Sequence, residues 1–212
     1  MEYLGRHIDH IVYCVPNFEQ AIDDLEKKLG CPINLGGRHL NQGTKNALLN
    51  LGAGCYFEIL AIDQSNDSIS APRWMGIDLI TEPCITRWAL KSTQLESDLE
   101  ILKKHNTELA KSFQGERAIE DGTLLQWQMS LPAAHPKIEL APFFLDWSKS
   151  DFHPTEKLPN YCSLEKIEFQ KVKTNTKIDC CFDELFTETI FEEAQSDRIM
   201  ISIKGPNGIL KI

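Results

Sequence analysis

The N-terminal part of the chain alternates between patterns typical of strands and of a helix. HIDHIVYCV is rich in β-branched and aromatic residues and ends at Pro16, which cannot donate to a β-ladder. Asn17 then fits an N-cap with Gln20 three residues later, and apolar residues follow at helical spacing as far as Gly30. NALLNL and CYFEILAI come next, joined by a glycine turn. The pattern predicts a strand, a helix and then two or three strands.

The same order of elements recurs twice further along the chain. CITRWALKS predicts a strand, Thr93 and Glu96 fit a capping box for a helix, and GERAIEDGTLLQWQMSL predicts a hairpin that turns at Asp121-Gly122. PFFLDW predicts a closing strand. A weaker third copy runs from SLEKIEFQKV through a short helix capped by Asp179 to a terminal hairpin. The repeat lies in the order of elements and not in the residues.

Length and charge limit the classes of protein that this chain fits. Its 212 residues suit one large domain or two small ones. The formal net charge is -9 and no basic stripe is visible, which argues against binding to nucleic acid or to an anionic membrane surface. No apolar run approaches the length of a membrane span. A small anionic ligand held by a single arginine remains compatible with this charge.

The seven cysteines are scattered and form no CxxC pair, so neither a zinc knuckle nor a thioredoxin-type motif is indicated. Several lie inside apolar runs, where cysteine usually behaves as a small buried hydrophobe. MEYLGRHIDH has no basic region followed by an apolar stretch, and so does not resemble a signal peptide. We therefore expect a cytoplasmic protein.

The alternation of side chains along strands indicates two candidate catalytic or metal-binding residues. Side chains alternate along a strand, so His10 should lie on one face of the first strand, with Asp9 and Ile11 on the other. In CYFEILAI, Glu58 should lie opposite Phe57. Because the helix must cover the apolar face, His10 and Glu58 should point together into the opposite cavity. A histidine and a carboxylate are half of a divalent-metal site or an acid–base pair.

Both residues also have purely structural interpretations. His10 would serve equally as a hydrogen-bonded core histidine. A buried carboxylate such as Glu58 is costly unless it is paired, and Arg38 or Arg87 would be a suitable partner. The residue types alone leave these alternatives open.

Several blocks of sequence resemble a known family. DHIVY followed by VP, a helix that ends in Leu-Gly, GGRH, GTKNALLNLG and YFEI resemble the glyoxalase-like domain proteins. These belong to the vicinal oxygen chelate superfamily, with the glyoxalases, bleomycin-resistance proteins and extradiol dioxygenases. TRWAL, GTLLQWQMSLP, PFFLDW and the HP at His153-Pro154 are similar to later blocks of the family. The resemblance covers about the first 155 residues, and the C-terminal unit matches only in outline.

The resemblance implies an α+β fold in which repeated βαβββ units form a curled mixed sheet, or cup, with helices outside. The paired units would span residues 6–147. A third, partial βαβββ-like unit would span residues 160–212 and pack on the first.

Metal ligands in the superfamily lie on the first and last strands of each unit, and His10 and Glu58 fall on those positions here. The matching positions of the second unit are Arg87 and Asp146, of which only the aspartate could bind a cation. In the third unit the first position is Lys166. The ligand set is therefore incomplete, and the sequence leaves open whether the protein uses a divalent metal ion as a cofactor.

The stretch GGRHLNQGTKNALLNLG has the character of a binding-site rim and inner wall. Arg38 offers a planar fork that suits an anion, and His39 can donate or accept a hydrogen bond near neutral pH. Alternation places these two on opposite faces, so at most one points into the cup, and we favour Arg38 as the anion anchor. Asn46 and Trp127 complete the predicted substrate-binding set, although Trp127 would also serve as core or cup lining.

We therefore expect a glyoxalase-like protein acting on a small polar or anionic molecule, with Glu58 and His10 as catalytic or metal-binding residues. Lyase, isomerase and dioxygenase chemistry all fit the fold, which does not choose among them. The rival interpretation is a binding protein that sequesters a small molecule without turnover. A third interpretation is an inert module used for oligomer contacts. The sequence leaves open whether the protein forms a homodimer.

Overall fold

The computed structural model describes residues 6–118, 124–186 and 191–212. Fifteen helices and strands form three units within these ranges, and short 3-10 segments lie between them. Their order is the predicted one, except that the third unit contains an additional short strand at Phe191–Ala194. The first unit comprises β1 (Ile8–Cys14), α1 (Phe18–Leu29), β2 (Asn34–His39), β3 (Thr44–Asn50) and β4 (Tyr56–Ile62). The second comprises β5 (Cys84–Lys91), α2 (Leu95–His105), β6 (Ser112–Ala118), β7 (Leu124–Ser130) and β8 (Phe143–Asp146). The third comprises β9 (Ser163–Val172), α3 (Lys177–Leu185), β10 (Phe191–Ala194), β11 (Arg198–Gly205) and β12 (Gly208–Lys211).

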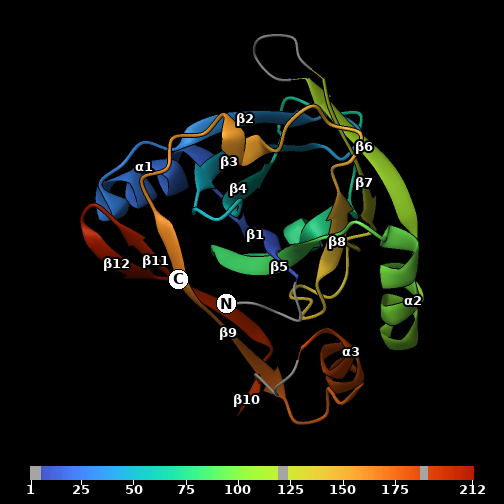
Figure 1. Cartoon of the computed structure of the whole chain (residues 1–212). Coiled ribbons are helices and arrows are strands. Elements are labelled where there is room, and N and C mark those ends of the chain that lie inside the picture. The colour runs from blue at the N-terminus through green and yellow to red at the C-terminus, as the bar shows by residue number, and fades with distance from the viewer. Residues whose placement is uncertain (1–5, 119–123, 187–190) are drawn as a thin grey trace.

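The first two units share one curled, mixed sheet, which confirms the predicted fold class. Its strand order is β2-β3-β4-β1-β5-β8-β7-β6. Within each unit the first and last strands pair in parallel, and β1 pairs antiparallel with β5 where the units meet. The sheet curls until its edge strands β2 and β6 lie near each other, as Figure 1 shows. The turn predicted at Asp121-Gly122 lies outside the described residues, but its flanking strands β6 and β7 pair antiparallel.

Local sequence signals explain α1. The Asn17 side chain accepts a hydrogen bond from the Gln20 amide at 3.1 Å, so it is the N-cap as predicted. Gly30 has φ 78 and ends the helix in the left-handed conformation, where a side chain would be strained. Phe18 and Leu25 are buried against the outer face of the sheet.

The predicted caps of the other helices were wrong. Gln94, and not Thr93, precedes α2, and its amide donates to Ser92 Oγ at 3.1 Å. Thr176 precedes α3, so Asp179 lies inside the helix, where its carboxylate binds Lys171. Neither Gln94 nor Thr176 makes a side-chain capping hydrogen bond.

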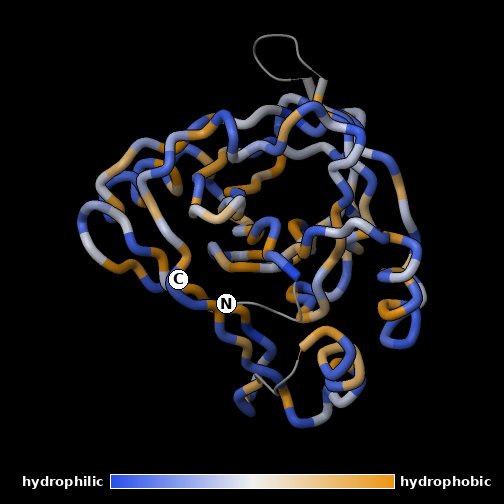
Figure 2. The backbone as a smooth tube through the Cα atoms, in the orientation of Figure 1, coloured by the Kyte–Doolittle hydropathy of each residue, from blue (hydrophilic) through white to orange (hydrophobic). Residues whose placement is uncertain are grey.

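The sheet has an apolar core on each face, and Figure 2 shows hydrophobic segments distributed through the fold. The outer core lies under the helices, and Trp88 on β5 is fully buried there. The third unit forms its own sheet, in the order β10-β9-β11-β12, and packs on this outer core. Phe169 of β9 lies 4.9 Å from Trp88, measured between ring centroids. The third unit thus covers the outside of the curled sheet and leaves the concave side open.

The connection from Trp147 to β9 runs past β2 and β3 (Figure 1). Asn50 holds it in place, because its side-chain amide donates to the carbonyls of Thr155 and Leu158 at 3.0 and 3.1 Å. Pro154, at the start of the 3-10 segment η2 (Pro154–Glu156), is buried. A segment whose composition is that of a polar linker therefore forms part of the concave side.

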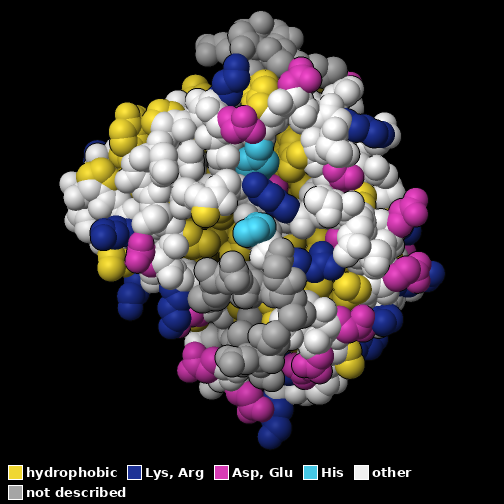
Figure 3. Space-filling view, in the orientation of Figure 1, with side chains coloured by type: hydrophobic (Ala, Val, Ile, Leu, Met, Phe, Trp, Pro, Cys, Tyr) yellow, Lys and Arg dark blue, Asp and Glu magenta, His cyan; other side chains and the backbone are white. Residues whose placement is uncertain are grey.

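Acidic and basic side chains are interspersed over the face shown in Figure 3. Of the helices in the described part of the chain, none combines the length and the apolar character that crossing a membrane requires.

Candidate functional site

The concave side of the curled sheet encloses a small inner cavity of about 30 Å³. Its wall combines side chains from both units with residues of the connections. They are His10, His39, Asn46, Leu48, Tyr56, Glu58, Trp74, Met75, Trp127, Met129, Leu145, Trp147 and Pro154. A volume of this size holds about one or two water molecules.

His10 and Glu58 meet in this cavity, as strand alternation predicts. The parallel pairing of β1 with β4 places Val12 beside Glu58, two residues along from His10. His10 Nε2 lies 3.6 Å from Glu58 Oε2, and both side chains are almost fully buried. Tyr56 stacks on the His10 ring with centroids 4.6 Å apart, which limits rotation of the imidazole.

Asn46 positions the Glu58 carboxylate. Its side-chain amide, on β3, donates to Glu58 Oε1 at 2.6 Å. Oε1 is therefore held from one side while Oε2 faces His10. The alternative partners for Glu58 are engaged elsewhere: Arg38 pairs with Asp63, and Arg87 binds backbone carbonyls.

Asp9 is a site residue that simple alternation assigned to the wrong face. The pairing of β1 with β5 shifts register between Ile8 and His10, and this irregularity brings Asp9 to the same side as His10. Asp9 Oδ1 lies 2.7 Å from His10 Nδ1. A buried aspartate in an apolar strand requires partners, and that cost is the signal in the sequence that marks it.

Two residues from the connection after β8 complete the environment of Asp9. Trp147 Nε1 donates to Asp9 Oδ2 at 2.8 Å, and His153 Nε2 lies 3.1 Å from the same oxygen. Sequence reasoning assigned no role to His153 beyond the resemblance of its block. Its approach to Asp9 depends on a connection whose path has no local pattern.

Asp9 is ionised in the folded protein and orients His10. Burial acts to raise the pKa of Asp9, but the hydrogen bonds from His10 and His153 outweigh it and hold that pKa well below the usual range. A carboxylate can only accept, so His10 Nδ1 carries the proton shared with Asp9. The other ring nitrogen, Nε2, is directed at Glu58.

Arg38 and His39 lie on opposite sides of β2, as predicted, but it is His39 that lines the inner cavity. His39 Nδ1 lies 3.1 Å from Thr44 Oγ1. The Arg38 guanidinium binds Asp63 and donates to Ser65 Oγ at 2.8 Å, and its side chain is half exposed. The structure thus brings together four of the five predicted binding or catalytic positions on these first-unit strands, and leaves Arg38 outside the cavity wall.

Trp127 lies in the cavity wall, and its place depends on a glycine. Gly115 faces it across the β6–β7 pair, and a Cβ on that glycine would lie 2.4 Å from the indole ring. Trp147 packs beside Trp127 with ring centroids 5.3 Å apart. The two indoles close one side of the inner cavity.

The 3-10 segment η1 (Trp74–Leu79) contributes two further wall residues that sequence reasoning missed. Met75 has φ 60 and ψ 13, a conformation that is costly for a residue with a side chain. Gly76 follows at φ 69, where a Cβ would meet the Lys137 carbonyl oxygen at 2.5 Å. These constraints insert Trp74 and Met75 into the cup.

The donors present do not make a complete divalent-metal site. Among the described residues no group of three or more His, Cys, Asp or Glu side chains could hold an ion. His10 and Glu58 supply two ligands. At the matching positions of the second unit, Arg87 is a cation that binds backbone carbonyls, and Asp146 lies on the strand face opposite the cavity-lining Leu145.

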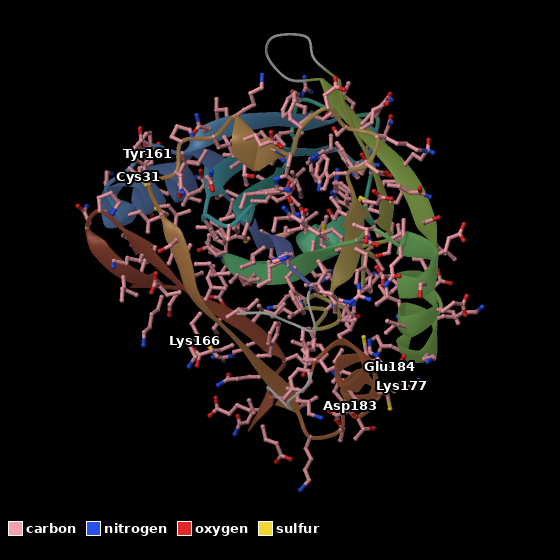
Figure 4. The ribbon with its side chains drawn as sticks, in the orientation of Figure 1. Cys31, Tyr161, Lys166, Lys177, Asp183 and Glu184 are labelled. Atoms are coloured by element: carbon pink, nitrogen blue, oxygen red, sulfur yellow. The ribbon has the colours of Figure 1, made fainter. Side chains whose placement is uncertain are left out.

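The third unit does not complete the set either. Lys166 lies on β9, away from the centre of the curled sheet, as Figure 4 shows. Its ammonium group binds Glu168 at 2.7 Å.

Comparison with known proteins places this geometry in a family. A family model described as a glyoxalase-like domain matches residues 8–177. A search of curated proteins finds no match. Among solved structures, a hypothetical protein from Staphylococcus aureus aligns with a TM-score of 0.65 at 14% identity, covering 96% of this chain and 97% of that one.

Two methylmalonyl-CoA epimerases also align, with lower scores. The enzyme from Mycobacterium tuberculosis has a TM-score of 0.38 and 17% identity, covering 66% of this chain and 85% of its own. The enzyme from Streptomyces coelicolor, in complex with 2-nitronate-propionyl-CoA, has a TM-score of 0.42 and 12% identity, covering 69% and 97%. At these identities the likeness concerns the fold alone.

Proposed function

This chain belongs to the glyoxalase-like domain family, and on that premise we propose that its cup binds a small polar molecule and transfers a proton within it, as an isomerase or a lyase. The observation that carries this proposal is that the buried side chains of His10 and Glu58 face each other in the wall of the small inner cavity. Burying two titratable side chains is costly, and packing alone does not require it. Such pairs are typical of acid–base catalysis.

The proposed step is removal of a proton from a carbon next to a carbonyl group. The Glu58 carboxylate takes this proton, and the electron pair of the broken C–H bond moves to the carbonyl oxygen as an enolate. When His10 carries a proton on Nε2 as well as on Nδ1, its Nε2–H donates a hydrogen bond to that oxygen and stabilises it. Return of the proton to another position or face gives an isomer, and departure of a leaving group from the neighbouring carbon gives a lyase product.

The neighbouring residues support these roles. Asn46 holds one oxygen of Glu58, so that the other remains available to react. Asp9 fixes the His10 ring through the contact at Nδ1. His39 and Trp127 lie in the cavity wall as substrate-positioning residues. No step of this proposal passes through a metal ion, because the described donors supply only two ligands.

Deuterium exchange tests this proposal with a panel of compounds and does not require the substrate to be identified first. The protein is incubated in D₂O with a set of small carbonyl compounds, and loss of the proton next to the carbonyl is followed by NMR. We expect at least one compound to exchange. Glu58→Gln should slow that exchange by about 10²–10⁴-fold, the usual contribution of general acid–base catalysis.

The matched control is Glu19→Gln, which removes an exposed carboxylate on α1. Circular dichroism establishes that both variants fold. Exchange that is unchanged in Glu58→Gln would contradict the assigned role.

Non-catalytic binding is the second candidate, and the incomplete ligand set and the small inner cavity favour it. In that case compounds of the panel would raise the melting temperature, since a ligand well above its dissociation constant stabilises by a few kcal/mol. No deuterium would exchange with any of them.

A further inference from the structure

A second and larger cavity adjoins the inner one. This outer cavity has a volume of about 430 Å³. It lies where the two edges of the curled sheet approach each other. Asn41 and Gln42 of the β2–β3 turn line it on one side, and Phe113 to Glu116 of β6 line it on the other. Both cavities share the same three residues, His39, Trp74 and Trp127.

Trp74 is the shared residue that lies on no strand of the sheet, since His39 lies on β2 and Trp127 on β7. Its indole Nε1 donates to Thr44 Oγ1 at 3.2 Å, and its ring meets the edge of His39 with centroids 5.1 Å apart. On the outer side Phe113 lies 6.2 Å from it, centroid to centroid. Trp74 therefore stands between the two cavities and bridges β2 to β6.

The backbone on either side of Trp74 is held firmly. Before it, the Arg73 guanidinium binds Asp78 at 2.6 Å and the Ile69 carbonyl at 2.7 Å. After it, Met75 occupies the left-handed conformation, and its amide donates to the Pro132 carbonyl at 3.1 Å. This strained backbone persists only because the surroundings fix it, which is typical of functional sites.

We propose that Trp74 is the residue that determines substrate size in this cup. A substrate would place a compact reactive group in the inner cavity and its longer, neutral polar remainder in the outer cavity. This inference rests on the proposed function, because it assigns the two parts of one substrate to the two sides of Trp74.

Cavity size supports the division. Sites for small molecules typically measure about 300–1,000 Å³, a range that the outer cavity reaches and the inner one does not. The charges in the outer cavity indicate the chemistry of the remainder. Lys149 and Glu116 contribute one charge of each sign, beside the amide groups of Asn41 and Gln42. A neutral chain of hydroxyl or amide groups fits this lining better than an anion does.

The position of Trp74 between the two cavities can be tested without any substrate. Diethyl pyrocarbonate acylates accessible imidazole nitrogens and is too large for the inner cavity as it stands. Modification of His10 is followed by peptide mass spectrometry in wild type, Trp74→Ala and Trp74→Phe, with the exposed His7 as the internal reference. We expect Trp74→Ala to speed modification of His10 relative to His7 by at least about tenfold, and Trp74→Phe to stay within about twofold of wild type.

Equal rates of His10 modification in wild type and in folded Trp74→Ala would refute the claim that Trp74 separates the two cavities. Should Trp74→Ala fail to fold, Trp74→Leu carries the same comparison. This readout needs no turnover, so it stands even when every compound fails to exchange deuterium and the proposed function falls.

A second experiment tests whether the outer cavity binds a neutral polar part of the substrate. It uses ketoses that have the same carbonyl end. Dihydroxyacetone, erythrulose and fructose have progressively longer hydroxylated chains, and fructose 6-phosphate adds a negative charge. We expect kcat/KM for deuterium exchange to rise at least about tenfold from dihydroxyacetone to fructose, with no further gain from the phosphate. Equal values for the three neutral sugars, or a preference for the phosphate, would refute this assignment.

Discussion

Replacing Asp9 by asparagine separates the charge of this residue from its shape. The aspartate accepts hydrogen bonds from His10, Trp147 and His153. The asparagine oxygen can keep the two bonds from Trp147 and His153, while its amide group then faces His10 Nδ1. An N–H facing an N–H is repulsive, so His10 should move its proton from Nδ1 to Nε2. In that tautomer Nε2–H points at Glu58 while Nδ1 accepts from the new amide.

The cost follows from the hydrogen bonds that change. A bond to a charged acceptor contributes about 1.5–3 kcal/mol and a neutral one about 0.5–1.5 kcal/mol. The two retained bonds therefore lose about 1 kcal/mol each, and weakening of the charged bond to His10 adds a similar or larger amount. Removal of a desolvated charge offsets part of this loss. We expect net destabilisation of about 2–4 kcal/mol, which lowers the Tm by about 5–15 °C in a chain of this size.

Denaturant unfolding followed by tryptophan fluorescence measures the free energy, with the exposed Asp23→Asn as the matched control. Nitrogen-15 NMR of the histidine rings reports the tautomer directly. A change in stability below about 0.5 kcal/mol, together with an unchanged His10 tautomer, would refute the assignment of Asp9 as the residue that orients His10.

The pH dependence at Asp9 has a defined sign. Because its folded pKa is depressed, Asp9 contributes stability above its unfolded pKa, near the ordinary value of 3.8, and that stability is lost as pH falls toward the folded value. Asp9→Asn should therefore flatten the acid limb of the stability curve, which unfolding measurements between about pH 5 and pH 2 would detect.

Three further predictions concern other parts of the chain. Whether Arg38 anchors an anion stays untested, but its pairing with Asp63 and its place outside the inner-cavity wall favour the opposite outcome. We therefore expect Arg38→Lys to change the affinity for a panel acid and its amide by less than about twofold, which calorimetric titration measures, and a larger loss for the acid alone would restore the anchor role. Burial lowers the pKa of His105, but its bond to Glu139 outweighs this and raises it above 6.5. Stability from this pair is therefore full below pH 6.5 and is lost as pH rises through the folded pKa, and His105→Gln should flatten that decline in denaturant unfolding. Cys180 is the exposed thiol among those described and should react first with Ellman's reagent, as peptide mass spectrometry would show.

Local sequence was sufficient for the features that depend on near neighbours. The caps of α1 involve Asn17 and Gly30, each acting within one turn of the helix. The facing of His10 and Glu58 follows from the period of two along regular strands and from the apolar face that the helix must cover. The same period correctly separated Arg38 from His39.

The tertiary structure decided where distant segments meet. Asp9 joins His10 because β1 shifts register against β5, a strand far along the chain, and no pattern within β1 records that shift. Trp74 and His153 come from connections whose paths are set by packing and by hydrogen bonds to Thr44 and Asp9. A period along one strand specifies which face a side chain takes. The completed cup depends on contacts between segments far apart in sequence. These contacts form, and contribute to stability, only when the whole chain has folded.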